Sequence, residues 1–588
     1  MIDNKNMILA IVLSIAILLG FQTYFDATRP PPPEQPVGTE QQVASGNLPQ
    51  PSATVGQTPS VPSVAGGQAP NIPGASAVIG ATRQEILDRN NRVHINTPRL
   101  HGSIALTGGR IDDLTLADYR ETLDPESAEI ILLSPKGVDG AYYTQFGWVG
   151  APGVKVPDQD TQWKADSQTL TPEHPVTLTW DNGEGLAFSR TYSVDANYMF
   201  SISQKVVNTG SSTAALNPFG FVSRRSTPET TGFYILHEGM LGVNEGTLSE
   251  IDYDDVQEKG IIKQSGKGGW IGITDKYWLA ALIPDQKLNA QSRYMHRTEG
   301  LVDMYQVDYL GPQQAVAPNS TITAQNHFFA GAKEVRLLDG YEESMGIERF
   351  DLAIDFGWFY FLTKPIFHAL LWLNDRVLNL GIAILVLTVG IKLVMFPLAN
   401  KSYTSMSKMK KLQPEMTKLR ERFGEDKMKL NQEMMELYKK EKVNPASGCL
   451  PIFVQIPVFF ALYKVLFVTI EMRQAPFYGW IHDLSAPDPT SVFNMFGMLP
   501  FTPPEFLMIG IWPLIMGITM YLQQKLNPQP TDPMQAKIFL FLPIMFTFLL
   551  ARFPAGLVIY WAWNNLLSIL QQWYIMKRMG ISNKDALK

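Results

Sequence analysis

A single lysine lies inside an apolar stretch that is long enough to cross a bilayer. Residues 380–398 hold no other charged side chain, and Lys392 lies eight residues before Asn400, which closes the stretch. At 1.5 Å per residue, the lysine is about 12 Å inside that end. Its side chain reaches only roughly 6 Å, too short to carry the ammonium group to the membrane surface. Because a charge at that depth needs water or a partner, Lys392 favours a functional role over a structural one, in a wet cavity that admits polar cargo.

The segment 401–448 carries a second pattern of candidate binding residues. Apolar side chains recur three and four residues apart up to Phe423, and Gly424 separates them from a second amphipathic stretch. The methionines of this predicted helical hairpin are Met406, Met409, Met416, Met428, Met434 and Met435. Two interpretations stay open. The apolar stripes pack on each other, or the adaptable methionines receive varied hydrophobic segments of another protein.

Motifs of catalysis and cofactor binding are missing from the sequence. It has no Walker loop, no G-x-S-x-G, no H-E-x-x-H and no Cys/His cluster with metal-ligand spacing. We therefore expect no cofactor and no enzymatic activity, and an ATP-driven transporter is disfavoured. Gln455 and Asn564 are polar candidates for the cavity of Lys392, although hydrogen bonding between helices is the simpler explanation for each.

The elements that would position these residues fall into an acidic and a basic part. Residues 26–345 carry 23 Lys and Arg against 37 Asp and Glu, and the remainder carries 26 against 18. The first part is predicted to contain a cytoplasmic N-terminus (1–6), an apolar span (7–25), a Pro/Gly-rich linker (26–79) and an all-β domain of sandwich type (80–345). The apolar span is either a cleaved signal peptide or an uncleaved anchor, and its length favours the anchor.

The second part is predicted to be helical and to lie in the membrane. Its segments are an interfacial amphipathic helix at 346–376, span 2 at 377–400, the hairpin at 401–448, span 3 at 449–473, a loop at 474–506, span 4 at 507–524, a loop at 525–536, span 5 at 537–552, a turn with span 6 at 553–576, and a tail at 577–588. The loop 401–448 has 12 Lys and Arg, whereas 474–505 has none, so the positive-inside rule places the hairpin in the cytoplasm. The fold class is therefore a polytopic α-helical membrane protein of six spans, with its large all-β domain outside.

Several short motifs resemble those of the YidC membrane protein insertases of the Oxa family. They are Gln432-Glu433-Met434-Met435, Leu437-Tyr438-Lys439, Val443-Asn444-Pro445, Gly448-Cys449, Arg473-Gln474-Ala475-Pro476-Phe477, Asp532-Pro533-Met534-Gln535 and Phe553-Pro554-Ala555-Gly556-Leu557-Val558. The motifs lie between residues 350 and 580. The layout, with an anchor and a large periplasmic β domain, is similar to the Gram-negative form of the family.

The resemblance implies a five-helix core in the bacterial inner membrane, a groove open to cytoplasm and lipid, and a periplasmic supersandwich. Lys392 would supply the groove charge at a position where the family usually has arginine. The substrate-contact residues would include Ile456, Pro457, Phe459, Tyr560 and Trp561. The implied partners are nascent hydrophobic membrane proteins, membrane lipids, the Sec translocon, the ribosome and the signal recognition particle receptor, with no direct binding of nucleic acid. No nucleotide would be hydrolysed.

Two rival functions remain open from the sequence. An ion-coupled transporter would use Lys392 and a periplasmic solute-binding domain, but no inverted repeat or pair of broken helices surrounds a midplane site. A membrane-anchored, sugar-processing enzyme would have little use for five elaborated spans after its β domain.

Overall fold

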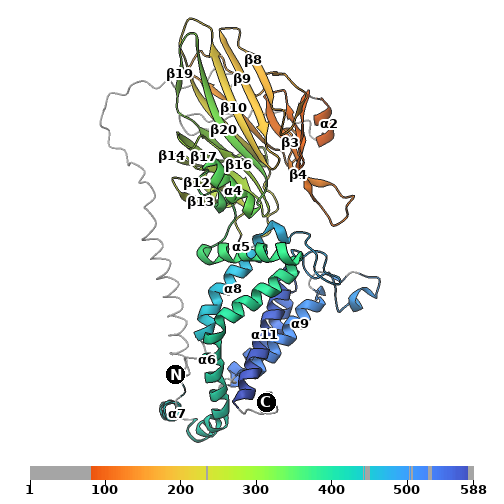
Figure 1. The fold of residues 1–588 in the computed structure, drawn as a ribbon, viewed down its shortest axis with the longest axis vertical. Helices are drawn as coiled ribbons and strands as arrows, with labels where there is room; N and C mark the ends of the chain where they lie inside the picture. Colours follow the sequence, from red (N-terminus) through yellow and green to blue (C-terminus); the bar gives the residue numbers. More distant parts are fainter. Residues whose placement is uncertain are drawn as a thin grey trace, which may run out of the picture.

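Two regions make up the structure, a β domain and a helical region, with helix α5 between them (Figure 1). The structure is a computed structural model and describes residues 81–89, 91–232, 236–424, 426–441, 443, 450–501, 503–504, 507–527 and 533–579. The predicted anchor 7–25, the linker 26–79 and all but the first three residues of the tail 577–588 lie outside the described residues.

Two large sheets form the β domain. The first contains, in spatial order, β14 (Ile261–Lys267), β17 (Asn289–Glu299), β18 (Val302–Leu310), β11 (Ala214–Arg225), β5 (Tyr142–Gly150), β3 (Arg110–Arg120), β2 (Leu100–Ala105), β1 (Arg92–Asn96) and β7 (Thr169–Leu170), with β19 (Gln314–Val316) on β11 and β4 (Glu129–Leu133) on β3. The second contains β13 (Thr247–Ile251), β12 (Gly239–Asn244), β15 (Trp270–Thr274), β16 (Trp278–Ile283), β20 (Ser320–Ala332), β10 (Met199–Asn208), β9 (Leu186–Val194), β8 (Val176–Asp181) and β6 (Lys164–Ala165). The short helices of this region are α2 (Arg83–Arg89), α3 (Tyr253–Lys259) and α4 (Val335–Met345).

The sheets pack face to face because their strands alternate apolar and polar side chains. Strand β9 buries every second residue from Leu186 to Val194, the pattern of a strand with one face in a core. The rings of Phe146 on β5 and Phe328 on β20 meet edge to face across the layers, with centroids 6.3 Å apart. Gly331 is required on β20, because a Cβ there would collide with the ring of Tyr198. The predicted all-β sandwich is confirmed.

The described chain after the β domain is mostly helical, as predicted, with a long connection between η3 and α9. Its elements are the 3₁₀ turn η1 (Phe350–Ala353), α5 (Tyr360–Val377), α6 (Leu380–Phe423), α7 (Lys427–Lys440), α8 (Leu450–Val468), η3 (Ile470–Met472), η4 (Met495–Gly497), α9 (Ile511–Leu526), α10 (Pro533–Leu550) and α11 (Ala555–Arg578). Among the described helices, α6 is long and apolar enough to cross a membrane, and 455–468 and 534–550 form shorter apolar helices.

Helix α6 continues past the boundary that the sequence suggested near residue 400. It runs through 44 residues, about 66 Å, against a hydrocarbon core of about 30 Å. A change from apolar to charged side chains marks a solvent boundary, but it does not end a helix. Pro397 and Pro414 lie inside α6, which is not straight in Figure 1. Span 2 and the first arm of the hairpin are therefore one element.

Specific polar contacts hold the β domain on the helices. Lys464 on α8 pairs with Asp355, with Nζ and Oδ2 2.5 Å apart. The Gln474 amide donates to the backbone oxygens of Arg120 and Thr122 in the β domain, at 3.0 and 2.9 Å. The ammonium of Lys276 lies 4.3 Å from the centroid of the Phe467 ring at the end of α8. These contacts fix the β domain at the α5 end of the helical region.

Candidate functional site

Lys392 lies on α6, directed at the last helix of the chain. Its Nζ donates to Ser568 Oγ on α11 at 2.8 Å, and that hydroxyl donates to the backbone oxygen of Asn564 at 2.8 Å. Within the described part of the chain, no carboxylate forms an ion pair with Lys392. A half-buried ammonium with one hydroxyl acceptor keeps unused donor capacity for an anionic or polar partner.

The apolar surface next to Lys392 is open. Leu393 and Val394 are 66% and 81% exposed, and Phe396 is also exposed. Large apolar side chains on the outside of a protein mark a contact with lipid or with another protein. Phe396, four residues after Lys392, lies on the same face of α6 as the lysine, whereas Leu393 and Val394 lie on other faces of the helix.

The predicted substrate-contact residues occupy two helices that meet. Phe459 on α8 and Trp561 on α11 contact each other, with ring centroids 4.9 Å apart, and Phe546 on α10 extends the aromatic cluster at 6.3 Å from Trp561. Ile456 is exposed on α8, while Pro457 is half-buried there. These positions form a partly open apolar surface.

Tyr560 has a different environment from the other four predicted substrate-contact residues. Its side chain is 1% exposed and belongs to the main hydrophobic core. A substrate could touch it only after the neighbouring helices part. The two polar candidates, Gln455 on α8 and Asn564 on α11, are half-buried.

The predicted hairpin forms between α6 and α7. The Tyr438 hydroxyl on α7 lies 3.8 Å from the Met416 sulfur on α6. Met406, Met409 and Met434 are half-buried, whereas Met428 and Met435 are exposed. The two interpretations of the stripe therefore divide between residues, because some methionines pack within the hairpin and others face outward.

Sequence reasoning missed the partners of the cations. Ser568 was not singled out, although it is a small polar residue four positions after Asn564 on the same helix. Lys410 Nζ donates to the Lys525 backbone oxygen at the end of α9, and Lys411 Nζ donates to that of Met579 at the end of α11, at 2.8 and 2.7 Å. Carbonyl groups at helix ends often accept hydrogen bonds from lysine. The signal for these contacts in the sequence was therefore the adjacent pair of lysines.

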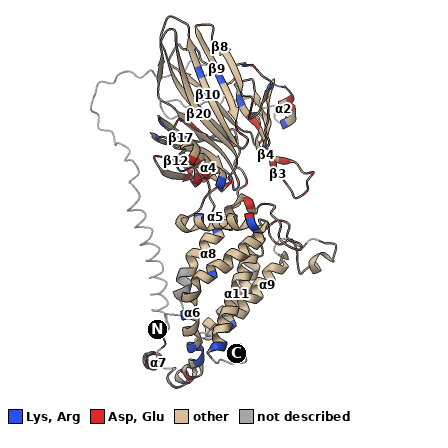
Figure 2. Cartoon of the chain, in the orientation of Figure 1, with Lys and Arg blue, Asp and Glu red and all other residues tan. Residues whose placement is uncertain are grey.

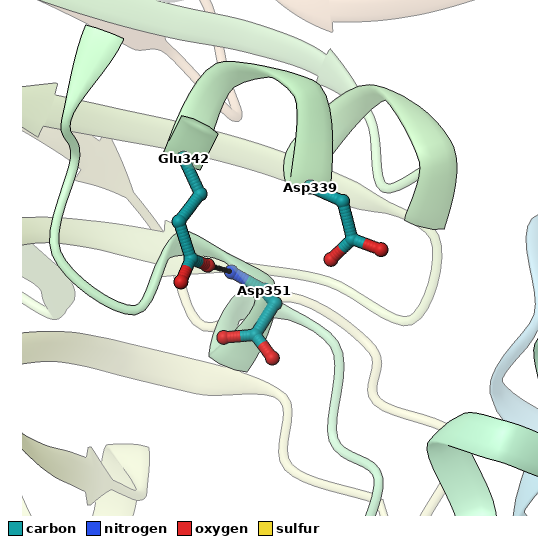
Figure 3. A group of neighbouring side chains, drawn as sticks. All are labelled: Asp339, Glu342 and Asp351. Atoms are coloured by element: carbon teal, nitrogen blue, oxygen red, sulfur yellow. Dashed lines mark hydrogen bonds between the residues drawn. The ribbon is translucent and has the colours of Figure 1, made fainter. Parts of the chain in front are cut away.

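Three carboxylates gather where the β domain meets α5. Asp339, Glu342 and Asp351 have oxygens within 4.8 Å of one another (Figure 3). Lys364 on α5 fills this group, with Nζ 2.9 Å from Asp339 Oδ1 and 2.7 Å from Asp351 Oδ2. Burial favours the neutral amine, but the hydrogen bonds to Asp351 and Asp339 and the charge of Asp351 together outweigh it and raise the pKa of Lys364. The cluster is a structural junction whose negative charge the Lys364 ammonium partly offsets.

Charged residues are distributed unevenly along the molecule. Figure 2 shows Lys and Arg at the end of the helical region that is far from the β domain, and clustered Asp and Glu near α4. Aromatic residues border both ends of the helices: Trp358, Phe361 and Trp372 are exposed on or next to α5, and Trp573 and Tyr574 are exposed near the end of α11. Exposed Trp and Tyr at two levels are typical of the two interfaces of a membrane.

Two family models together match most of the chain. The model described as YidC periplasmic domain matches residues 92–369, and that described as 60Kd inner membrane protein matches residues 372–583. A protein of Methylobacterium nodulans named Membrane protein insertase YidC is 52% identical over 589 residues, which cover 98% of this chain and 96% of that protein. A protein of the same name from Granulibacter bethesdensis is 48% identical over 598 residues and covers 100% of both. A crystal structure titled as an active YidC insertase covers 82% of this chain and 92% of its own, with 17% identity and a TM-score of 0.34.

Proposed function

This chain belongs to the family of YidC membrane protein insertases, and from that membership we propose that it moves hydrophobic proteins into the bacterial inner membrane through a polar groove at Lys392. The groove is open to cytoplasm and lipid. The observation that carries the proposal is an ammonium inside the helical region whose hydrogen-bond partner is the Ser568 hydroxyl, with no ion-paired carboxylate among the described residues.

The proposed membrane position follows from element lengths and from the aromatic residues at both ends. Helix α11 has 24 residues and is about 36 Å long, enough for a hydrocarbon core of about 30 Å. The exposed aromatic residues near α5 then lie at the periplasmic interface, and Trp573 lies at the cytoplasmic one. Together with the anchor predicted at 7–25, the helices α6, α8, α9, α10 and α11 would give six spans, five of them the insertase core.

Electrostatics gives Lys392 its role. A substrate must carry a short polar segment across the membrane, and an acidic segment would meet a cation about one third of the way into the apolar part of α6 from its cytoplasmic end. Attraction between this segment and Lys392, together with the hydration of the groove, lowers the barrier to entry of the polar segment. The apolar span of the substrate would then contact Ile456, Pro457, Phe459 and Trp561, and leave into lipid, where burial of its apolar surface drives the reaction. Tyr560 would join this surface only when α8 and α11 separate.

The hairpin of α6 and α7 would receive the substrate first. Its exposed methionines, Met428 and Met435, offer an adaptable apolar surface on the cytoplasmic side. Nascent chains on the ribosome, delivered with the signal recognition particle receptor, would reach this surface. Larger substrates would require the Sec translocon as partner.

Reconstitution tests this function directly. Purified protein in liposomes is mixed with a small single-span protein, with no nucleotide present, and insertion is measured by protection from protease. The expected result is several times more protected substrate than in liposomes without the protein, with no increase when ATP is added. Insertion no greater than in protein-free liposomes would contradict the proposal, and a strict need for ATP would contradict its energetic part.

A further inference from the structure

A small cavity lies between the end of α9 and the beginning of α10, away from Lys392. It measures about 210 Å³ and is lined by Tyr521, Gln524, Lys525, Ala536, Lys537 and Leu540. This volume is below the 300–1,000 Å³ common for whole small-molecule ligands, and it suits part of a molecule, such as a headgroup. In the proposed topology, the cavity lies at the cytoplasmic surface of the membrane.

The described lining of the cavity is cationic. Lys525 and Lys537 line it from opposite helices, and none of its six lining residues is acidic. A third lysine, Lys410 on α6, binds the backbone oxygen of Lys525. Burial and the charge of Lys525 lower the pKa of Lys410. Two like charges that line one cavity, with a third lysine bound next to one of them, favour an anionic occupant.

The dipole of α10 also favours an anion in the cavity. Helix α10 begins at Pro533, and Lys537 lies within its second turn, so the positive end of the helix dipole is beside the cavity. The opposing negative end of α9 is partly neutralised, because Lys410 already binds one of its last carbonyl oxygens.

Apolar surface continues from the cavity along both helices. Ile518 and Leu522 on α9 are exposed, and so are Ile538, Leu540 and Phe541 on α10. In the proposed topology these side chains face the lipid tails. A free phosphate ion would use the lysines alone, whereas a phospholipid would use the lysines and the apolar faces together.

We propose that the α9–α10 cavity binds the headgroup of an anionic phospholipid from the cytoplasmic leaflet, with its acyl chains along the exposed faces of α9 and α10. This inference rests on the proposed membrane position of these helices and not on the groove at Lys392. Basic pockets between membrane helices on the cytoplasmic side commonly hold such headgroups.

Native mass spectrometry of the full chain released from detergent micelles tests the site. Phosphatidylglycerol and phosphatidylcholine with the same acyl chains are titrated against wild type and against the double variant Lys525→Gln/Lys537→Gln. Each lysine is expected to contribute about fivefold to anionic lipid binding, so the double variant should lose about 30-fold for phosphatidylglycerol and little for phosphatidylcholine. The matched control Lys408→Gln/Lys439→Gln removes the same charge from exposed positions of the hairpin and should bind like wild type.

Three outcomes would overturn the site. The first is equal binding of both lipids by wild type, and the second is an equal loss in the double variant and the control. The third is displacement of the bound lipid by inorganic phosphate at low millimolar concentration, which would assign the cavity to a free anion. Insertion into liposomes of one fixed lipid composition is measured in parallel. Absence of specific lipid binding together with normal insertion would reject this site alone. Insertion by wild type that is no greater than in protein-free liposomes would reject the proposed function.

Discussion

Two lysines, one in each region of the molecule, differ in burial and in the carboxylates around them. Lys333 follows the last strand of the β domain, is 4% exposed, and donates to Thr274 Oγ1 at 2.8 Å. Four carboxylates act on its charge: Asp275, Asp355, Glu238 and Glu250. Lys392 is half-buried and likewise donates to a hydroxyl, that of Ser568, and neither lysine forms an ion pair with a carboxylate among the described residues. The comparison contrasts a buried cation that acidic residues of the fold surround with a half-buried cation whose charge remains available to a ligand.

The largest difference in stability is expected between two separate variants, in which either Lys333 or Lys392 is replaced by glutamate. Lys333→Glu adds a fifth carboxylate to the four around it and should destabilise the β domain by about 3–5 kcal/mol. Lys392→Glu should leave the unfolding of the β domain unchanged. Hydrogen exchange of the backbone amides of β16 and β20, in the full chain in detergent, measures the stability of the β domain in both variants. Equal protection of these amides in the two variants would contradict the proposed difference between Lys333 and Lys392.

The pH dependence of stability should identify Lys333. Burial lowers its pKa to about 8 from 10.5, against the opposing effect of the carboxylates. Between these values the unfolded chain binds more protons than the folded one, so stability rises with pH from about 8 towards 10.5, by at most about 3 kcal/mol. The gain is absent below pH 8, where both states carry the proton.

The neutral variant Lys333→Met provides the control for this effect. Its β domain should be more stable than wild type at pH 7, and the difference should shrink between pH 8 and 9.5. Thermal unfolding of the full chain at pH 7, 8, 9 and 9.5 checks this. A difference that does not change over this range would show that Lys333 does not titrate there.

A smaller effect is expected at the ion pair between Lys464 and Asp355. Both side chains are mostly buried, at 14% and 18% exposed, so Lys464→Met should cost about 2 kcal/mol, between the values for exposed and for fully buried pairs. Faster hydrogen exchange near Asp355 and at the end of α8 would report it. The exposed pair of Arg336 and Asp375 is the matched control, and Arg336→Met should have no measurable effect. An equal response of the two variants would mean that burial of the pair does not matter.

The smallest effect should follow from Ser568→Ala. One hydrogen bond to a charged group is lost, but water replaces it in a hydrated groove, so insertion should change less than about threefold. The liposome assay measures this against wild type. A loss of insertion as large as that of Lys392→Glu would mean that the hydrogen bond, and not the charge of Lys392, is required for function.

The sequence predicted the architecture and the most informative residue, but not the contacts. Alternating apolar residues, such as those of β9, are a local signal, and so is one charge in an apolar run. The pairing of Lys392 with Ser568 joins residues 176 positions apart, and no local pattern specifies it. The burial of Tyr560 likewise depends on how α11 packs against its neighbours. The continuity of α6 was missed because charged residues such as Lys401 are good helix formers, so solvent and helix boundaries need not coincide.

A charge-swap experiment in liposomes tests the central claim most directly. Wild type, Lys392→Arg and Lys392→Glu are each given two single-span substrates that differ only in an acidic or a basic segment to be moved across. We predict that Lys392→Arg inserts both like wild type. Lys392→Glu should lose about tenfold on the acidic substrate, which is about 1.4 kcal/mol, and little on the basic one. Equal insertion of both substrates by all three proteins would contradict an electrostatic role for Lys392.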